Sequence, residues 1–425
     1  MRAFPPVFRT LRYRNFRLFF MGQGVSLVGT WMEHVAMSWL VYRLTNSPFL
    51  LGVMGFLTQA PTFILSPFAG VMSDRWDRRR VIIITQTLYM IQAMALAFLA
   101  LTGTIAVWHL IALGVFVGCV NSFDIPCRQS FIVEMVDDKE DLGNAIALNS
   151  LMFNAARLAG PSLAGVIIAM SSEGVCFLIN GISFIAAIAA LCFMRIKKHE
   201  TKPENTHILE DLREGFSYVY GFKPIRFILL LLSVVSFTGI SYVVLMPVFA
   251  RDILKCGPGT FGIMMASTGL GALAATIYLA MRKSVLGLSR LIPVFSSIFS
   301  IGIIVFSVSR ALWFSLSALA VAGFGIMAHM ASSNIILQTI VDDDKRGRVM
   351  SFYTMAFIGV APFGSLFSGI MASKIGATNT LIAGGSICVI ASLIFARKLP
   401  VIKKAIHPIY RKMGIIPEVV SGISP

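Results

Sequence analysis

The stretch from residue 48 to residue 80 reads PFLLGVMGFLTQAPTFILSPFAGVMSDRWDRRR, and it contains the two features that decide the fold. Its first part, 48–72, contains no charged residue. A helix needs about 20 mainly apolar residues to cross about 30 Å of hydrocarbon, so this part is long enough to span a membrane. Its second part, 74–80, gathers two acids and four arginines. The stretch therefore predicts a spanning helix that ends at a strongly basic loop.

Similar long apolar runs recur along the whole chain of 425 residues, which is 56% hydrophobic and only 13% charged. Soluble proteins are about 45–50% apolar and about 25% charged. The apolar runs are long and do not alternate with polar residues, which excludes a membrane barrel. We therefore predict an all-α integral membrane protein with twelve spans, at 16–43, 48–72, 81–102, 106–135, 142–170, 174–194, 226–250, 258–281, 288–309, 311–340, 346–373 and 376–396.

The residues that give the formal net charge of +16 are distributed unevenly among the loops between these spans. The basic residues gather in every second loop, at 2–17, 75–80, 195–226, 282–290, 345–348 and 397–412. Cytoplasmic loops carry such an excess, so we expect a multi-pass protein of the bacterial cytoplasmic (inner) membrane with both termini in the cytoplasm. Topology accounts for the surplus of positive charge, and we expect no nucleic-acid partner.

One long polar stretch divides the chain into two halves. We predict an N-terminal six-helix bundle at 1–194, a cytoplasmic linker at 195–225, a C-terminal six-helix bundle at 226–396 and a cytoplasmic tail at 397–425. Repeated residues support this division. At an offset of 204, Gly143, Phe153, Gly160 and Gly165 fall on Gly347, Phe357, Gly364 and Gly369; at an offset of 210, Pro48 and Gly52 fall on Pro258 and Gly262.

The six cysteines form no C-x-x-C pair, and five of them lie in predicted spans. Buried cysteine behaves as a small apolar side chain. We therefore expect neither a disulfide framework nor a metal site.

The loop after the second span carries a recognisable motif. Gly70, Asp74, Arg75, Arg78 and Arg79 resemble the major facilitator superfamily signature G-x-x-x-D-R-x-G-R-[RK], although Asp77 replaces its second glycine. The resemblance implies the major facilitator fold, with 12 transmembrane helices in two pseudo-symmetric six-helix bundles. It also implies that this loop docks against the start of span 11 and is released during transport. The alternative is that the cluster only fixes topology.

Three further segments narrow the resemblance to one branch. Residues 11–19, 40–45 and 144–150 are similar to the corresponding segments of the enterobactin-exporter-like branch. Members of that branch export siderophores, drugs and other amphiphiles. This similarity, rather than the composition, suggests efflux.

Span 5 contains Gly160, Pro161 and Gly165, which resemble the end of an antiporter motif, G-P-x-x-G-G. Ala164 replaces the first closing glycine, and alanine also stands at two earlier glycine positions. Antiport is what the resemblance implies. Close packing of ordinary membrane helices explains the same small residues.

Among the ionisable residues within the predicted spans, the candidates for a functional role are Glu33, Asp124, Arg128, Arg157 and His329. Ionisable groups inside a bilayer are costly and usually face a cavity or a partner. Glu33 and Arg157 reach similar depths in the membrane, so we expect that they are able to meet. Asp124 and Arg128 share one helix face at i and i+4, so they are either cavity charges or a structural pair. His329 is either a third cavity group in the opposite half or a packing residue.

These features together predict a secondary active transporter rather than an enzyme. We expect proton-coupled export of a small amphiphilic solute by alternating access, driven by the proton gradient without a cofactor. Asp124 is slightly favoured over Glu33 as the proton carrier because it lies deeper. Expected partners are the solute, protons and membrane lipid, and the expected state is a monomer. The alternatives are an importer or lipid flippase of the same fold, and a sensor that does not transport.

Overall fold

The computed structural model describes residues 6–73, 76–136, 138–195, 216–239, 241–282, 284–342 and 345–413. These residues form helices joined by short turns, and no strand occurs among them. The expected linker lies mostly outside the described residues, as do Asp74, Arg75 and the end of the tail.

The N-terminal half consists of a short 3-10 helix followed by six long helices. They are η1 (Pro6–Arg12), α1 (Arg14–Thr45), α2 (Pro48–Ser73), α3 (Arg78–Leu101), α4 (Val107–Glu134), α5 (Lys139–Met170) and α6 (Glu173–Phe193). Local sequence explains several of the boundaries. Asp77 accepts a hydrogen bond from the backbone N–H of Arg80 and caps α3, while Asn46 ends α1 in a left-handed conformation at φ 52°. Both residue types favour these positions.

The C-terminal half also has six membrane-length helical segments, but two of them contain π-helical turns. The seventh segment comprises α8 (Lys223–Val234), η2 (Val235–Gly239), α9 (Tyr242–Val248) and η3 (Phe249–Ile253). It is followed by α10 (Pro258–Ala280), α11 (Leu288–Val308) and α12 (Leu312–Ile340). The eleventh segment comprises α13 (Arg346–Thr354), η4 (Met355–Gly359) and α14 (Ala361–Ile375), and α15 (Ala377–Lys412) is the twelfth.

In the described part of the chain, eleven helical segments are long and apolar enough to cross a bilayer. The remaining helix, α1, is equally long, and the polar pair Glu33-His34 lowers its hydropathy. It packs between α5 and α6. The twelve expected spans are therefore present, with ends shifted by a few residues. The largest difference is at α15, which continues through the basic residues beyond 396 to Lys412 as one helix.

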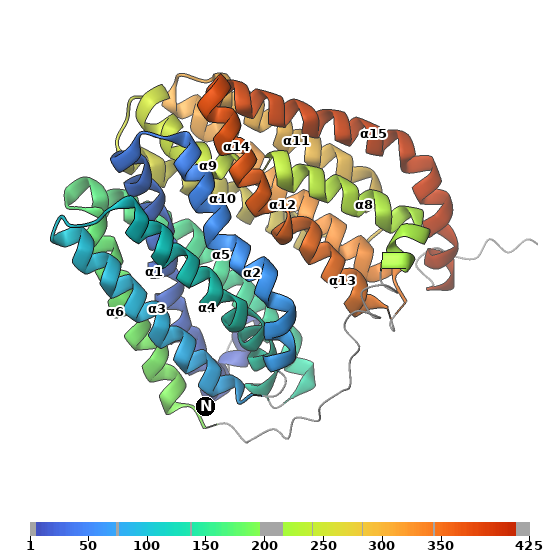
Figure 1. The fold of residues 1–425 in the computed structure, drawn as a ribbon. Coiled ribbons are helices and arrows are strands. Elements are labelled where there is room, and N and C mark those ends of the chain that lie inside the picture. The colour runs from blue at the N-terminus through green and yellow to red at the C-terminus, as the bar shows by residue number, and fades with distance from the viewer. Residues whose placement is uncertain are drawn as a thin grey trace, which may run out of the picture.

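The two halves repeat the same packing. In the first half α2 packs on α4 and α3 on α6; in the second half the corresponding pairs are α10 on α12 and α11 on α15. The halves meet through α2 with α14 and α5 with α10. Figure 1 shows the two bundles side by side, close together at one end and diverging toward the end that carries the N-terminus. We call the diverging end, where Arg78–Arg80 lie, the inner end, and the opposite end the outer end.

The repeated glycines explain why the halves approach so closely at the outer end. A Cβ placed on Gly52 of α2 would lie 2.8 Å from the Cα of Gly369 in α14. A Cβ on Gly262 of α10 would lie 2.9 Å from the Cα of Gly165 in α5. Only glycine permits these backbones to touch. The two contacts are equivalent under the internal repeat, which the sequence offsets had indicated.

Candidate functional site

A cavity of about 1660 Å³ lies between the two halves. Its wall is formed mainly by α1, α2, α3 and α4, and the eleventh segment closes the other side. Residues near the inner end also line it, including Phe216, Gly347 and Arg348, of which Phe216 is 61% exposed. The cavity therefore opens toward the inner end.

The outer end is closed by contacts between the halves. Tyr42, near the end of α1, donates a hydrogen bond from its hydroxyl to Asp252 in η3. The Arg251 Nη1 atom donates to the Asn46 side chain at 2.7 Å. We call Tyr42, Asn46, Arg251 and Asp252 the outer gate. Trp39 stacks on Phe261 across the same interface, with ring centroids 6.2 Å apart.

Glu33 lies in the cavity wall, and its carboxylate is held by amides. Gln92 of α3 donates to Oε1 at 3.0 Å, and Asn180 of α6 donates to Oε2 at 2.5 Å. Glu33 forms no salt bridge with any residue that the structure describes. An amide carries both donors and an acceptor, so after rearrangement it can bind a carboxylate or a protonated carboxyl group.

Asp124 has a different setting. It is fully buried, and its Oδ1 accepts hydrogen bonds from Thr85 at 2.7 Å and from Gln86 at 3.2 Å. Its other oxygen pairs with Arg128, one turn further along α4. Arg128 lines the cavity, but Asp124 lies behind the wall. The expected pair thus exists, and only its cation faces the cavity.

The other two expected charges do not join this group. Arg157 lies on α5 with its guanidinium carbon 5.8 Å from the Trp31 ring centre. Glu33 instead faces α6, because α1 turns Trp31 and Glu33 to different sides. The expected meeting of Glu33 with Arg157 is therefore not found. His329 is fully buried between α12 and α11, with Nδ1 3.3 Å from the carbonyl oxygen of Ile292, and it does not line the cavity.

The small residues of span 5 lie in close contacts between helices. A Cβ on Gly160 would lie 2.8 Å from the Val28 carbonyl oxygen of α1. Gly165 and the Pro161 carbonyl both contact α10 of the other half. The packing interpretation of this motif therefore accounts for all three positions, and Gly165 and Pro161 lie at the joint between the halves.

Two described arginines of the loop motif contact other helices of the N-terminal half. Arg78 pairs with Glu134 at the end of α4, at 2.7 Å. Arg79 donates to the Leu191 and Cys192 carbonyls at the end of α6, at 2.9 and 2.8 Å. Gly70 belongs to α2, whereas Asp74 and Arg75 lie outside the described residues. Docking of this loop on span 11 stays a prediction.

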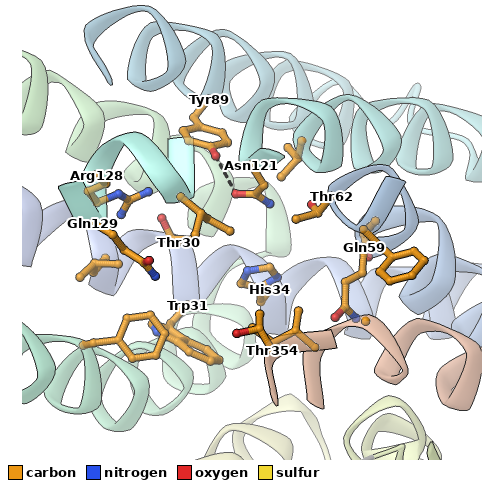
Figure 2. Close-up of a pocket in the computed structure, with 18 of the residues that line it drawn as sticks. Thr30, Trp31, His34, Gln59, Thr62, Tyr89, Asn121, Arg128, Gln129 and Thr354 are labelled. Carbon is orange, nitrogen blue, oxygen red and sulfur yellow. Dashed lines mark hydrogen bonds between the residues drawn. The ribbon is translucent and has the colours of Figure 1, made fainter. Parts of the chain in front are cut away.

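Several polar residues of the cavity were missed from the sequence. Figure 2 shows three of them: Gln129 beside the expected Arg128, His34 in the middle of the pocket, and Gln59 on the other side. Tyr89 donates a hydrogen bond to Asn121 at 2.6 Å (Figure 2). The sequence of α3 contains a signal for this polar wall, because polar side chains occur at every third position of an apolar span, at Gln86, Tyr89 and Gln92.

Comparison with known proteins agrees with this architecture. The family described as "Transmembrane secretion effector" matches residues 6–414. The Staphyloferrin A transporter of Staphylococcus aureus is 25% identical over 89% of this chain and 95% of its own length. The Enterobactin exporter EntS of Salmonella typhi is 24% identical over 89% and 91%. A crystal structure of a bacterial homolog to the human lysosomal transporter Spinster superposes with a TM-score of 0.69 at 14% identity, covering 92% of this chain and 98% of that one.

Proposed function

The chain belongs to the transmembrane secretion effector family of major facilitator transporters, and from this premise we propose that it exports a small amphiphilic solute in exchange for protons. Relatives that cover most of its length are a siderophore exporter and a transporter named for a siderophore, and their fold is that of transporters, not enzymes. The proton gradient of the cytoplasmic membrane supplies the energy in this proposal.

The observation that carries the coupling mechanism is the position of Glu33. It is an acid in the cavity wall that forms no salt bridge with the described residues and is held by Gln92 and Asn180. Asp124, by contrast, is committed to Arg128 and has no access to the cavity. We therefore assign the proton to Glu33 and a supporting role to Asp124, which reverses the order expected from depth alone.

The cycle then follows from the two ends of the molecule. With the inner end facing the cytoplasm, the cavity loads solute from the cell interior while the outer gate is closed. Opening of the gate releases the solute outside and exposes Glu33 to protons. Return to the described state delivers the proton inward. Alternating access of this kind needs one end closed whenever the other is open.

The test uses the purified protein in liposomes with a pH-sensitive dye inside and a panel of amphiphilic solutes with and without a carboxylate group. The parent protein is expected to move protons when a solute gradient is applied. Glu33→Gln should reduce this proton movement to that of empty liposomes while binding persists, because the cavity shape is unchanged. Glu140→Gln, at an exposed site on α5, is the control. Proton flux at the parental rate in Glu33→Gln contradicts the assignment.

A further inference from the structure

The charge distribution in the cavity is uneven. Glu33 is the only carboxylate among the described residues of its wall, whereas Arg128 and Arg348 both line it. The charge that balances Arg128 comes from Asp124, whose side chain is fully buried behind the wall. A solute entering the cavity therefore meets the guanidinium group and not its counter-charge.

Arg128 is held in place from behind. Thr85 and Gln86 fix one oxygen of Asp124, and the other oxygen pairs with Arg128, so the guanidinium has one anchored side. About a fifth of the Arg128 side chain, 21%, remains exposed. The Nε–H group is buried and has no acceptor among the described residues, so a solute would meet the exposed remainder of the side chain. A guanidinium has five N–H donors and matches the planar geometry of a carboxylate.

An aromatic surface accompanies this cation. Trp31 and Phe153 pack edge to face with centroids 5.7 Å apart, and both line the cavity. A second guanidinium, that of Arg157, lies 5.8 Å from the Trp31 ring centre. Figure 2 shows the Arg128 and Gln129 side chains on the same side of the pocket as Trp31, with Thr30 nearby. Charged and aromatic recognition groups thus lie on one side of the cavity.

We infer that Arg128 is the anion-binding residue of the cavity, which takes solutes with a carboxylate joined to an aromatic or otherwise apolar body. The carboxylate binds Arg128 beside Gln129, and the apolar body lies against Trp31 and Phe153. The inference rests on the proposed transport function and names the solute class of the same site. It is separate from the role of Glu33, because the two groups lie on different helices and have different partners.

The test compares two fluorescent probes that differ in one group. Dansylglycine carries a carboxylate at pH 7.5, and dansylglycinamide is its neutral counterpart. Titration of the full-length protein in nanodiscs should give a dissociation constant about tenfold lower for dansylglycine, as expected for a charge-assisted hydrogen bond. Equal constants, or no binding of either probe, overturn the inference.

Arg128→Gln alone leaves Asp124 buried without a counter-charge and can prevent folding. The double variant Asp124→Asn with Arg128→Gln removes both charges and keeps similar side-chain shapes. We expect it to bind both probes with equal constants, while Arg310→Gln, on the exposed outer surface, retains the tenfold preference. A preference that persists in the double variant overturns the assignment of Arg128. If the parent protein shows the tenfold preference for dansylglycine but no proton-coupled flux, the proposed function is contradicted and the anion site is not.

Discussion

Two acids within the spans, Asp124 and Glu33, have opposite settings in this protein. Asp124 is fixed by Thr85, Gln86 and Arg128 and has no access to the cavity, whereas Glu33 meets only amides and lies in its wall. Depth along a span is readable from sequence, but the direction in which a side chain points depends on how the helices are rotated against each other. For this reason both residues could be identified from the sequence, whereas which of them faces the cavity could not.

At the loop after α2, the change Asp74→Asn should strongly reduce transport while the protein still folds and inserts. The family resemblance implies that this charge belongs to an interface that forms and breaks in each cycle. The measurement is solute flux into liposomes at matched amounts of protein. The control is Asp77→Asn, which changes the cap of α3 and should lower stability by about 1 kcal/mol or less with little effect on flux. Parental flux in Asp74→Asn would show that the motif serves topology alone.

At the scale of elements, the seventh and eleventh segments differ from the other helices. Three π-helical turns occur in the described helices, η2, η3 and η4, and all lie in these two segments. The Ser236 hydroxyl of η2 donates to the Phe357 carbonyl of η4 at 2.5 Å, so two of the turns contact each other. Met355, Ile358 and Gly359 of η4 line the cavity. Such turns place local bends in helices and often occur at functional sites.

Neither the π turns nor the joints between the halves were predicted, but only the joints have a signal in the sequence. A π turn forms where tertiary contacts compensate for its poorer local geometry, and no residue type marks it. The joints have a sequence mark, because only glycine allows backbones to touch. The offsets that pair Gly165 with Gly369 and Gly52 with Gly262 indicated the repeat, and the structure shows that the halves meet at the same glycines.

Weakening the outer gate should favour the outward-open state. Asp252→Asn removes the charged acceptor of the Tyr42 hydroxyl, a hydrogen bond of about 1.5–3 kcal/mol, which changes a two-state ratio by about tenfold or more. Spin labels at positions 104 and 310, in outer turns of opposite halves, should then report a longer distance by electron paramagnetic resonance. Asp138→Asn, at the cap of α5, is the matched control. An unchanged distance distribution would mean that the gate does not set the balance.

The glycine joints give a second test of the closed outer end. In Gly262→Val the new side chain meets the Pro161 carbonyl and the Gly165 backbone, neither of which can rotate away. We expect transport to fall severely and the same pair of spin labels to move apart. In Gly257→Val the added Cβ meets nothing within 4 Å, so flux should stay close to the parental rate. Normal flux in Gly262→Val would show that the α5–α10 contact is dispensable.

At the scale of the whole molecule, the apolar runs made the number and order of the helices predictable, since hydrocarbon dictates their length. The cavity was less predictable, because its polar wall is assembled from helices far apart in the chain. It is also asymmetric. Glu33, Arg128 and most of the amides come from the N-terminal half, while the C-terminal half contributes η4 and its neighbours. One half therefore carries most of the recognition chemistry, and the other carries the π turns.

The proposed orientation is tested by cysteine labelling in a variant without native cysteines. Lys255→Cys, in the turn before α10 at the outer end, should react with an impermeant reagent in intact cells. Asn205→Cys, in the basic linker, should react only after permeabilisation, because positively charged loops stay in the cytoplasm. The reverse pattern would invert the topology and turn the proposed exporter into an importer.

The closed outer gate has a consequence for anyone who seeks to block this protein with a drug. In the state that the described residues show, contacts between the halves close the outer end, and the cavity opens toward the inner end. With the proposed orientation, a competitive blocker of that state has to enter the bacterium before it can act. A carboxylate designed to bind Arg128 would itself slow that entry. An esterified prodrug, cleaved in the cytoplasm, would reach the chamber where the free acid supplied outside does not.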